Sequence, residues 1–158
     1  MGAIDVFIYG ASGHGRVIAD ILRCSGHTVA GLIDDRELPD TLAWEKFRSL
    51  HPEGAIALGI GNNGDRERIF HQVRKAGYRL PVLIHPSAVI SESATIAEGS
   101  VVMPLSVINA GAEIGMGCII NSGAVIEHDC MLGDFVHASP RSALAGGAKI
   151  GHGAHIGI

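Results

Sequence analysis

The chain has 158 residues, of which 47% are hydrophobic and 18% are charged, and its formal net charge is −4. This composition excludes a disordered chain, and no uninterrupted apolar run reaches the ~18 residues that a membrane-spanning helix needs. The lysines and arginines lie mostly among as many acids, so we predict no nucleic-acid partner.

The N-terminus and the cysteines bear on the cellular compartment. No basic stretch precedes the first apolar run, which argues against a signal peptide. Cys24, Cys118 and Cys130 are an odd set without paired spacing, so reduced thiols are expected. Together these features predict a cytoplasmic protein.

The composition changes near residue 85. Residues 1–85 hold 20 of the 28 charged residues and six of the seven aromatic residues, whereas residues 86–158 hold eight charged residues and only Phe135. A segment without rings cannot fill a broad core, so it requires an architecture with a narrow interior. We therefore predict two domains, residues 1–85 and residues 86–158.

Residues 1–85 alternate between short apolar runs and amphipathic stretches. The first strand is expected at residues 6–9, and a helix through residues 17–22 follows and ends at Gly26. The later elements are strands at 28–33, 55–60 and 79–84 and helices at 41–50 and 65–76. Pro81 favours an edge position for the last strand. This alternation predicts a small Rossmann-like α/β domain with a mostly parallel sheet and helices on both faces.

Three polar turns follow the predicted strands, at residues 10–15, 34–35 and 61–64. Ligands of such sheets bind at the carboxyl ends of the strands. The glycine-rich turn opens a helix, whose N-terminus suits a phosphate, and Asp34 lies where a ribose-binding carboxylate is expected. Three interpretations stay open: glycines that only make tight turns, a nucleotide or nucleotide-sugar site, and an NAD site. The GxxGxG order of the glycines, in place of GxGxxG, disfavours NAD.

Residues 86–158 form a six-residue repeat. A branched aliphatic residue recurs at every sixth position, with one exception, Ala138: Ile90, Ile96, Val102, Ile108, Ile114, Ile120, Ile126, Leu132, Ala138, Leu144, Ile150 and Ile156. Two positions before each stands a small residue, except for Val136: Ala88, Ala94, Ser100, Ser106, Ala112, Cys118, Ala124, Cys130, Val136, Ser142, Ala148 and Ala154. One aliphatic and one small inward residue per hexad is the signature of a parallel β-helix, whose thin interior explains the missing rings.

With the hexads, the segments VFIYGASGHGRVIADIL, LIDD, GIGNN and NSGAVIEHDCMLGDFVHASP carry a family resemblance over the whole chain. The sequence resembles the sugar O/N-acetyltransferases of the sialic acid O-acetyltransferase and bacillosamine-pathway type. The resemblance implies a left-handed β-helix with about 18 residues per coil, and a homotrimer with active sites between subunits. It also implies acetyl-CoA as donor and a nucleotide-linked amino sugar as acceptor. The histidines show no HxxxH spacing on a helix, so we predict no metal.

Several polar side chains are expected to point outward from the β-helix, and His128 is the candidate catalytic base. A sugar amine must lose a proton as it attacks a thioester, and a histidine with a pKa near 6.5 suits that task. By resemblance, the catalytic pair is His128 and Asp129, with Asp129 fixing the tautomer. Neighbours on a straight strand point apart, so the pair requires a turn at residues 127–130 or a neighbouring backbone path. Glu127 is a second candidate for the orienting acid. A solvated polar corner is the alternative interpretation.

The resemblance also implies roles for the other site residues. Asn121 and His137 would contact the thioester or pantetheine end of acetyl-CoA, and an amide of the turn at Gly146 and Gly147 would serve the oxyanion. In the first domain, the phosphates would face Gly10, Ser12, Gly13, His14 and Gly15. The ribose, base or phosphate would contact Asp34, Asp35, Arg36 and Asn62.

The sequence stops at Ile158 in the middle of a repeat, so we expect the β-helix to be incomplete at its C-terminal end. The expected function is acetylation of the amino group of a nucleotide-linked amino sugar. The alternatives are a sialic acid or other sugar O-acetyltransferase, a non-catalytic nucleotide-sugar-binding module, and a small NAD-linked enzyme.

Overall fold

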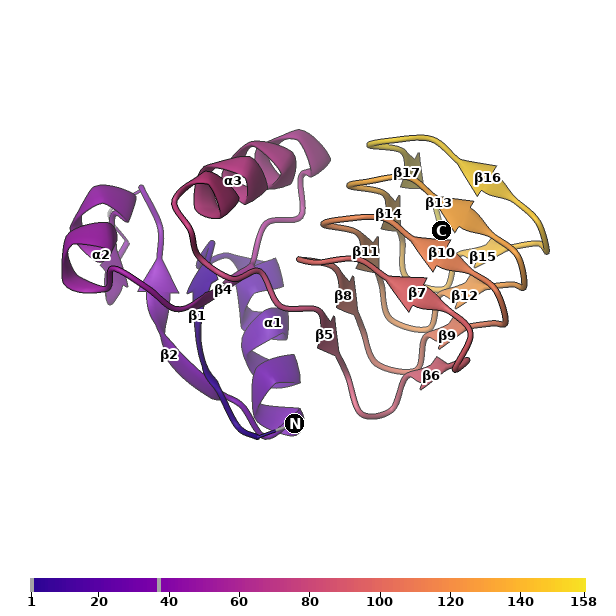
Figure 1. The fold of residues 1–158 in the computed structure, drawn as a ribbon, viewed down its shortest axis with the longest axis horizontal. Helices are drawn as coiled ribbons and strands as arrows, with labels where there is room; N and C mark the ends of the chain where they lie inside the picture. Colours follow the sequence, from indigo (N-terminus) through magenta and orange to yellow (C-terminus); the bar gives the residue numbers. More distant parts are fainter. Residues whose placement is uncertain (1, 37) are drawn as a thin grey trace. The chain divides into compact units, whose positions relative to one another are not determined.

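The structure is a computed structural model that describes residues 2–36 and 38–158. The chain divides into two units, Met1–Pro81 and Val82–Ile158. Each unit has its own sheets (Figure 1).

The first unit is a Rossmann-like α/β fold. Its elements in chain order are β1 (Asp5–Tyr9), α1 (Gly13–Cys24), β2 (Thr28–Ile33), β3 (Thr41–Leu42), α2 (Trp44–Leu50), β4 (Ala55–Leu58) and α3 (Asn63–Lys75). The strands are parallel in the order β3-β2-β1-β4. Successive strands are added on one side of β1 up to β3, and then β4 is added on the other side of β1. Open α/β sheets bind ligands at such a point, where the strand order reverses.

No helix among the described residues is long and apolar enough to cross a membrane.

Two segments of this unit differ from the expectation. Residues 41–50, predicted as one helix, are divided into the edge strand β3 and helix α2. The strand predicted at 79–84 does not form in this sheet: Arg79 makes only an isolated bridge to Ala55. The next strand, β5 (Leu83–Ile84), pairs instead with β8 of the second unit. The reason is the hexad repeat, because Ile84 lies six residues before Ile90 and continues the same pattern.

Five of the six aromatic residues of the first unit pack together at α2. The buried ring of Phe47 lies 4.8 Å from that of Phe7, 5.9 Å from that of Trp44 and 5.5 Å from that of Tyr78. This core accounts for the concentration of rings in the first half of the sequence.

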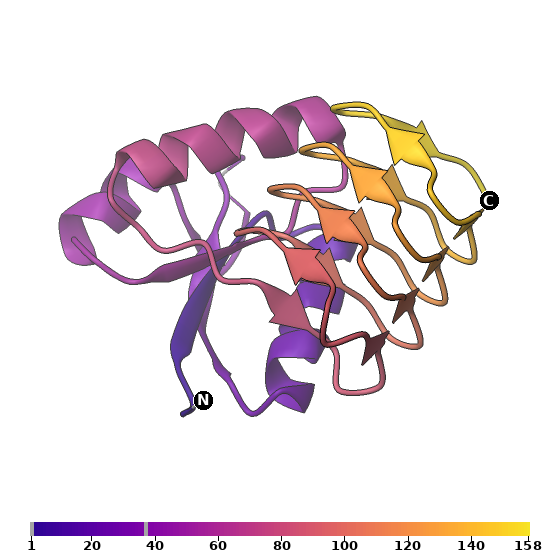
Figure 2. The ribbon, with the colours of Figure 1, turned by 45° about the vertical axis from the view of Figure 1, so that its right-hand side comes forward.

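The second unit is a parallel β-helix whose coils stack along its axis (Figure 2). Its strands are all two residues long: β5, β6 (Val89–Ile90), β7 (Thr95–Ile96), β8 (Val101–Val102), β9 (Val107–Ile108), β10 (Glu113–Ile114), β11 (Ile119–Ile120), β12 (Val125–Ile126), β13 (Met131–Leu132), β14 (His137–Ala138), β15 (Ala143–Leu144), β16 (Lys149–Ile150) and β17 (His155–Ile156). They form three sheets, β17-β14-β11-β8-β5, β16-β13-β10-β7 and β15-β12-β9-β6. Glu113 pairs with Met131, 18 residues later, so each coil contains three hexads, as predicted.

The interior contains the two inward residues of each hexad. Ala112, Cys118, Ile120 and Ile126 are all essentially inaccessible to solvent in one continuous cluster. The alternate residue of each strand points outward, as Glu113 does beside Ile114. The narrow interior inferred from the sequence is thereby confirmed.

The turns between strands repeat one backbone conformation. From Gly99 to Gly153, every sixth residue has a positive φ of about the same size, and the position is occupied by glycine at six of ten sites. The others are Leu105, Asp129, Phe135 and Arg141, with φ between 58° and 60°. Residues other than glycine seldom adopt this left-handed backbone conformation. Its recurrence at these four positions shows that the repeat imposes the turn.

Candidate active site

The turn between β12 and β13 joins His128 to Asp129. Asp129 occupies the left-handed position of that turn, with φ at 59°. The bend directs its carboxylate back to the preceding ring, and Oδ2 of Asp129 lies 2.8 Å from Nδ1 of His128. The turn, one of the two arrangements predicted to allow this pairing, is present.

The hydrogen bond organises the His128 ring. The carboxylate of Asp129 can only accept, so Nδ1 carries the proton and the lone pair of neutral His128 lies on Nε2. The hydrogen bond and the charge of Asp129 raise the pKa of His128 above its usual 6.5, and the charge of Glu127 raises it further. An exposed imidazole of this kind can accept a proton at Nε2.

The Nε2 side of the His128 ring lies against Gly146, one coil later. A Cβ atom at position 146 would lie 2.5 Å from Nε2, so any side chain there would displace the ring. The N–H of Gly147 donates to the carbonyl of His128 at 2.8 Å. Among the described residues, the N–H of Gly146 has no such partner, so of these two amides it is the one available to a ligand.

Glu127 is held by Asn109, one coil earlier, whose Nδ2 donates to Oε2 of Glu127 at 3.0 Å. Glu127 is half-buried beside the exposed His128, and its hydrogen bond to Asn109 directs it away from a contact with Nδ1, which Asp129 already occupies. The sequence interpretation did not include Asn109. Its separation of 18 residues from Glu127, one full coil, is the signal that identifies it.

Asn121 and His137 form a second polar group. Nδ2 of Asn121 lies 3.0 Å from Nε2 of His137, while the N–H of Ser122 donates to Oδ1 of Asn121 at 2.8 Å. The amide is therefore oriented with Nδ2 as donor, and Nε2 of His137 accepts. The ring of His137 stacks on that of His155 at 4.5 Å, as their spacing of one coil predicts.

The two polar groups do not meet within one chain. Asn121 begins the turn between β11 and β12, whereas His128 lies in the turn between β12 and β13. These are different corners of the same coil.

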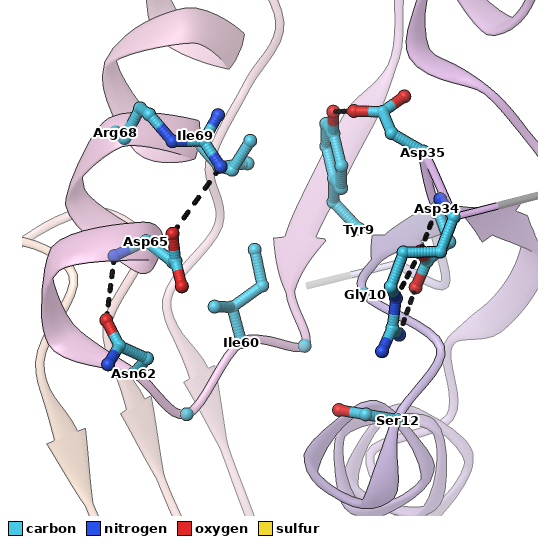
Figure 3. A pocket seen from close by; sticks show the side chains of 13 residues that line it. Tyr9, Gly10, Ser12, Asp34, Asp35, Ile60, Asn62, Asp65, Arg68 and Ile69 are labelled. Atoms are coloured by element: carbon cyan, nitrogen blue, oxygen red, sulfur yellow. Dashed lines mark hydrogen bonds and ion pairs between the residues drawn. The ribbon is translucent and has the colours of Figure 1, made fainter.

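The first unit has a pocket of about 380 Å³ where the three predicted polar turns converge (Figure 3). The volume lies in the range of small-ligand sites, about 300–1,000 Å³. Its lining includes six predicted residues, Gly10, Ser12, Asp34, Asp35, Arg36 and Asn62. Gly61, which begins the third predicted turn, also lines it, as do residues that the sequence interpretation missed: Tyr9, Gly59, Ile60, Asp65, Arg68 and Ile69.

Gly13, His14 and Gly15 do not line this pocket, although they were predicted to face phosphates. Gly15 has a packing reason, because a Cβ atom there would lie 2.0 Å from the carbonyl oxygen of Gly10. Gly10 itself has φ at 107°, which favours glycine. A Cβ at Gly13 would meet only the Arg16 side chain, at 3.8 Å, so neither crowding nor backbone conformation requires glycine there.

Asp34, which follows β2, is hydrogen-bonded to the glycine-rich turn. Its buried carboxylate accepts the N–H of Ala11 at 2.9 Å and binds Arg36 through Nε at 2.8 Å and Nη2 at 2.7 Å. The hydrogen bonds from Arg36 hold the pKa of Asp34 well below its usual value. Most of the acceptor capacity of Asp34 is therefore used within the protein.

Asp35 is also engaged. It accepts the hydroxyl of Tyr9 at 2.5 Å and the N–H of Trp44 at 2.8 Å. Burial, followed by the hydrogen bond to Asp35, raises the pKa of Tyr9 above its usual value. These contacts fix one wall of the pocket.

Both units match known families. Residues 5–73 match the PglD N-terminal domain, and residues 93–128 match the bacterial transferase hexapeptide, with six repeats. The chain is 37% identical over 106 residues to UDP-N-acetylbacillosamine N-acetyltransferase of Bacillus subtilis (strain 168), covering 60% of this chain and 49% of the relative. The matched part thus spans about half the length of the curated relatives.

Solved structures match over nearly the whole chain. A mutant of perosamine N-acetyltransferase from Caulobacter crescentus, in complex with CoA and GDP-perosamine, is 38% identical with a TM-score of 0.89, and the match covers 98% of this chain and 77% of the other. The acetyltransferase domain of PglB from Neisseria gonorrhoeae FA1090, in complex with acetyl coenzyme A, is 36% identical with a TM-score of 0.86, covering 98% and 80%. The chain therefore belongs to the left-handed β-helix sugar N-acetyltransferases that combine a PglD N-terminal domain with hexapeptide repeats.

Proposed function

We propose that the protein transfers an acetyl group from acetyl-CoA to the amine of a nucleotide-linked amino sugar, with His128 as general base. The observation that carries the proposal is the 2.8 Å hydrogen bond that Nδ1 of His128 donates to Oδ2 of Asp129. It leaves Nε2 as the proton acceptor at an exposed corner. The solved relatives with CoA, acetyl-CoA and GDP-perosamine support the same chemistry.

The residues at this corner fit a thioester and an amine. Acetyl-CoA supplies the acetyl group in activated form. As the new carbon–nitrogen bond forms and the carbon–sulfur bond breaks, the amine loses a proton, and Nε2 of His128 accepts it. Asp129 stabilises the resulting imidazolium, which returns the proton to the departing CoA sulfur. The N–H of Gly146 has no backbone acceptor among the described residues and can stabilise the carbonyl oxygen during transfer.

Asn121 and His137 are proposed to contact the pantetheine end of acetyl-CoA. Because they lie at a different corner from His128, a complete site requires a second copy of the chain. A homotrimer with sites between subunits meets this requirement. An outward row of valines on one sheet, Val89, Val107 and Val125, offers apolar surface for such contacts, and Val89 is 64% exposed.

The nucleotide is proposed to bind in the pocket of the first unit. The turn after β1 places Ser12 at the N-cap of α1, which has no acid in its first turn. A diphosphate is favoured near such a helix end. Cys118 and Cys130 are buried thiols of the β-helix that form no disulfide, which fits a reducing compartment and supports the cytoplasm.

Release of the CoA thiol from acetyl-CoA tests the proposal. We expect release with a nucleotide-linked amino sugar and none with the matched sugar that has a hydroxyl in place of the amine. His128→Ala should lower the rate by about 100-fold or more, whereas His85→Ala, in the same unit, should not. Acetylation of the hydroxyl sugar alone would favour an O-acetyltransferase, and nucleotide binding without any CoA release would favour a non-catalytic binding module.

A further inference from the structure

The pocket of the first unit has one carboxylate that the protein leaves accessible. Asp34 and Asp35 are both occupied by short hydrogen bonds. Asp65 has only a loose ion pair, in which Nη2 of Arg68 lies 3.6 Å from Oδ1, and its side chain is 61% exposed. Among the described residues, it is therefore the pocket carboxylate most free to bind a ligand.

Asp65 and Arg68 form one edge of the pocket. They are three residues apart near the start of α3, so both side chains lie on the same face of the helix. Arg68 is 64% exposed on its side chain, so its guanidinium also has unused donors. The edge thus presents the two carboxylate oxygens of Asp65 as acceptors beside the guanidinium N–H donors of Arg68 (Figure 3).

The same side of the pocket has an apolar surface. Ile60, after β4, and Ile69, on α3, line the pocket next to this edge (Figure 3). A flat ring can lie on such a surface, as ligand sites combine apolar walls with a few polar groups. The combination fits a nucleobase whose polar edge faces Asp65 and Arg68.

The order of donors and acceptors selects among the bases. The Watson–Crick edge of guanine has two adjacent N–H donors, N1 and N2, followed by the acceptor O6. A carboxylate can accept both N–H groups, and an arginine can donate to O6. Uracil has a single N–H between two carbonyl oxygens, so a carboxylate meets one donor and is repelled by an oxygen. Cytosine and adenine offer the carboxylate only one exocyclic amine.

We propose that Asp65 and Arg68 recognise the base of the nucleotide sugar, and that they select guanine over uracil. This inference rests on the proposed function, because it concerns the nucleotide that the same pocket would bind. The acceptor substrate is then a sugar linked to guanosine diphosphate.

Calorimetric titration of the chain with GDP, IDP, UDP and CDP tests the inference. GDP should bind at least about tenfold more tightly than UDP or CDP, the effect of one charge-assisted hydrogen bond. IDP lacks the N2 amine, so it should bind about tenfold more weakly than GDP for the same reason. Asp65→Asn should remove the difference in affinity between GDP and UDP, and Arg68→Gln should weaken the binding of GDP.

The matched control is Asp20→Asn on α1. Asp20 and Arg23 form an ion pair with the same spacing, on an exposed helix face outside this pocket. Thermal unfolding should show that both Asn variants remain folded. Equal affinities for GDP and UDP, tighter binding of UDP, no binding of either, or an Asp65→Asn effect no larger than that of Asp20→Asn would each overturn the inference. The proposed function is judged separately by CoA release, and acetylation of a UDP-linked amino sugar would leave it standing while the base assignment failed.

Discussion

The Nε2 atom of His128 lies against the backbone of Gly146, so closely that a Cβ atom there would be 2.5 Å away. The two residues are 18 positions apart and therefore occupy the same corner of neighbouring coils. The absence of a side chain at 146 gives the ring its position and leaves space beside the proposed base.

Gly146→Ala should therefore reduce activity with little effect on folding. The φ of Gly146 is not positive, so alanine causes no backbone strain, but its methyl group displaces the His128 ring. A displacement of this kind is expected to lower kcat/KM by about 100-fold. Steady-state kinetics and thermal unfolding together measure the two effects.

Gly77→Ala is the matched control for Gly146→Ala. Gly77 has a φ of 88° and open space around it, so alanine should cost about 1–2 kcal/mol of stability without affecting the rate. A wild-type rate in Gly146→Ala would contradict the proposed role of the ring position.

Asp129→Asn should shift the pH dependence of kcat/KM. A base must be neutral to accept a proton, so activity rises with pH through the pKa of His128. Asp129 raises that pKa above 6.5, and its removal should move the acid limb to lower pH. The rate at the plateau should also fall, because the imidazolium loses its partner. An unshifted limb would show that another group titrates.

Asp34→Ala should destabilise the first unit. It leaves the N–H of Ala11 and the guanidinium of Arg36 without their acceptor, which we expect to cost about 1–3 kcal/mol. The pKa of Asp34 is below the 3.8 of an unfolded chain, so its stabilisation is present above that pH and is lost as the pH falls through the lowered pKa. Denaturant unfolding at neutral pH measures the loss. Asp20→Ala, which breaks an exposed pair, should change stability by less than about 0.5 kcal/mol, and an equal effect of the two would refute the role of Asp34.

Ile114→Ala should destabilise the β-helix far more than Glu113→Ala on the same strand. Ile114 is buried in the core cluster, and its truncation should cost about 2–5 kcal/mol. Glu113 is exposed and should change stability by about 0.5 kcal/mol or less. Denaturant unfolding of the pair checks which residue of the hexad faces inward.

The interior of the β-helix could be predicted because the repeat is strictly periodic. Ile120 and Ile126 lie six residues apart and both point inward, and no other information is needed to place them. The first hexad was missed at Ile84, because a proline three residues earlier obscured the pattern. The left-handedness of the β-helix was predicted from the family resemblance, which the comparisons confirm, because the spacing of the repeat does not determine the hand.

The site was less predictable, because it depends on contacts between coils and on helix orientation. The left-handed turn at Asp129 and the contact of His128 with Gly146 arise only when neighbouring coils of the β-helix stack on one another. Asp65 and Arg68 were missed because the sequence does not reveal which face α3 turns to the pocket. The proposed roles of all these residues remain predictions.

The most direct test is mass spectrometry of the sugar after incubation with acetyl-CoA, the protein and a GDP-linked amino sugar. We expect one acetyl group on the sugar nitrogen with the wild-type protein. We expect almost none with His128→Ala, although that variant still binds the nucleotide. Acetylation at an unchanged rate by His128→Ala would contradict the role of His128 as general base.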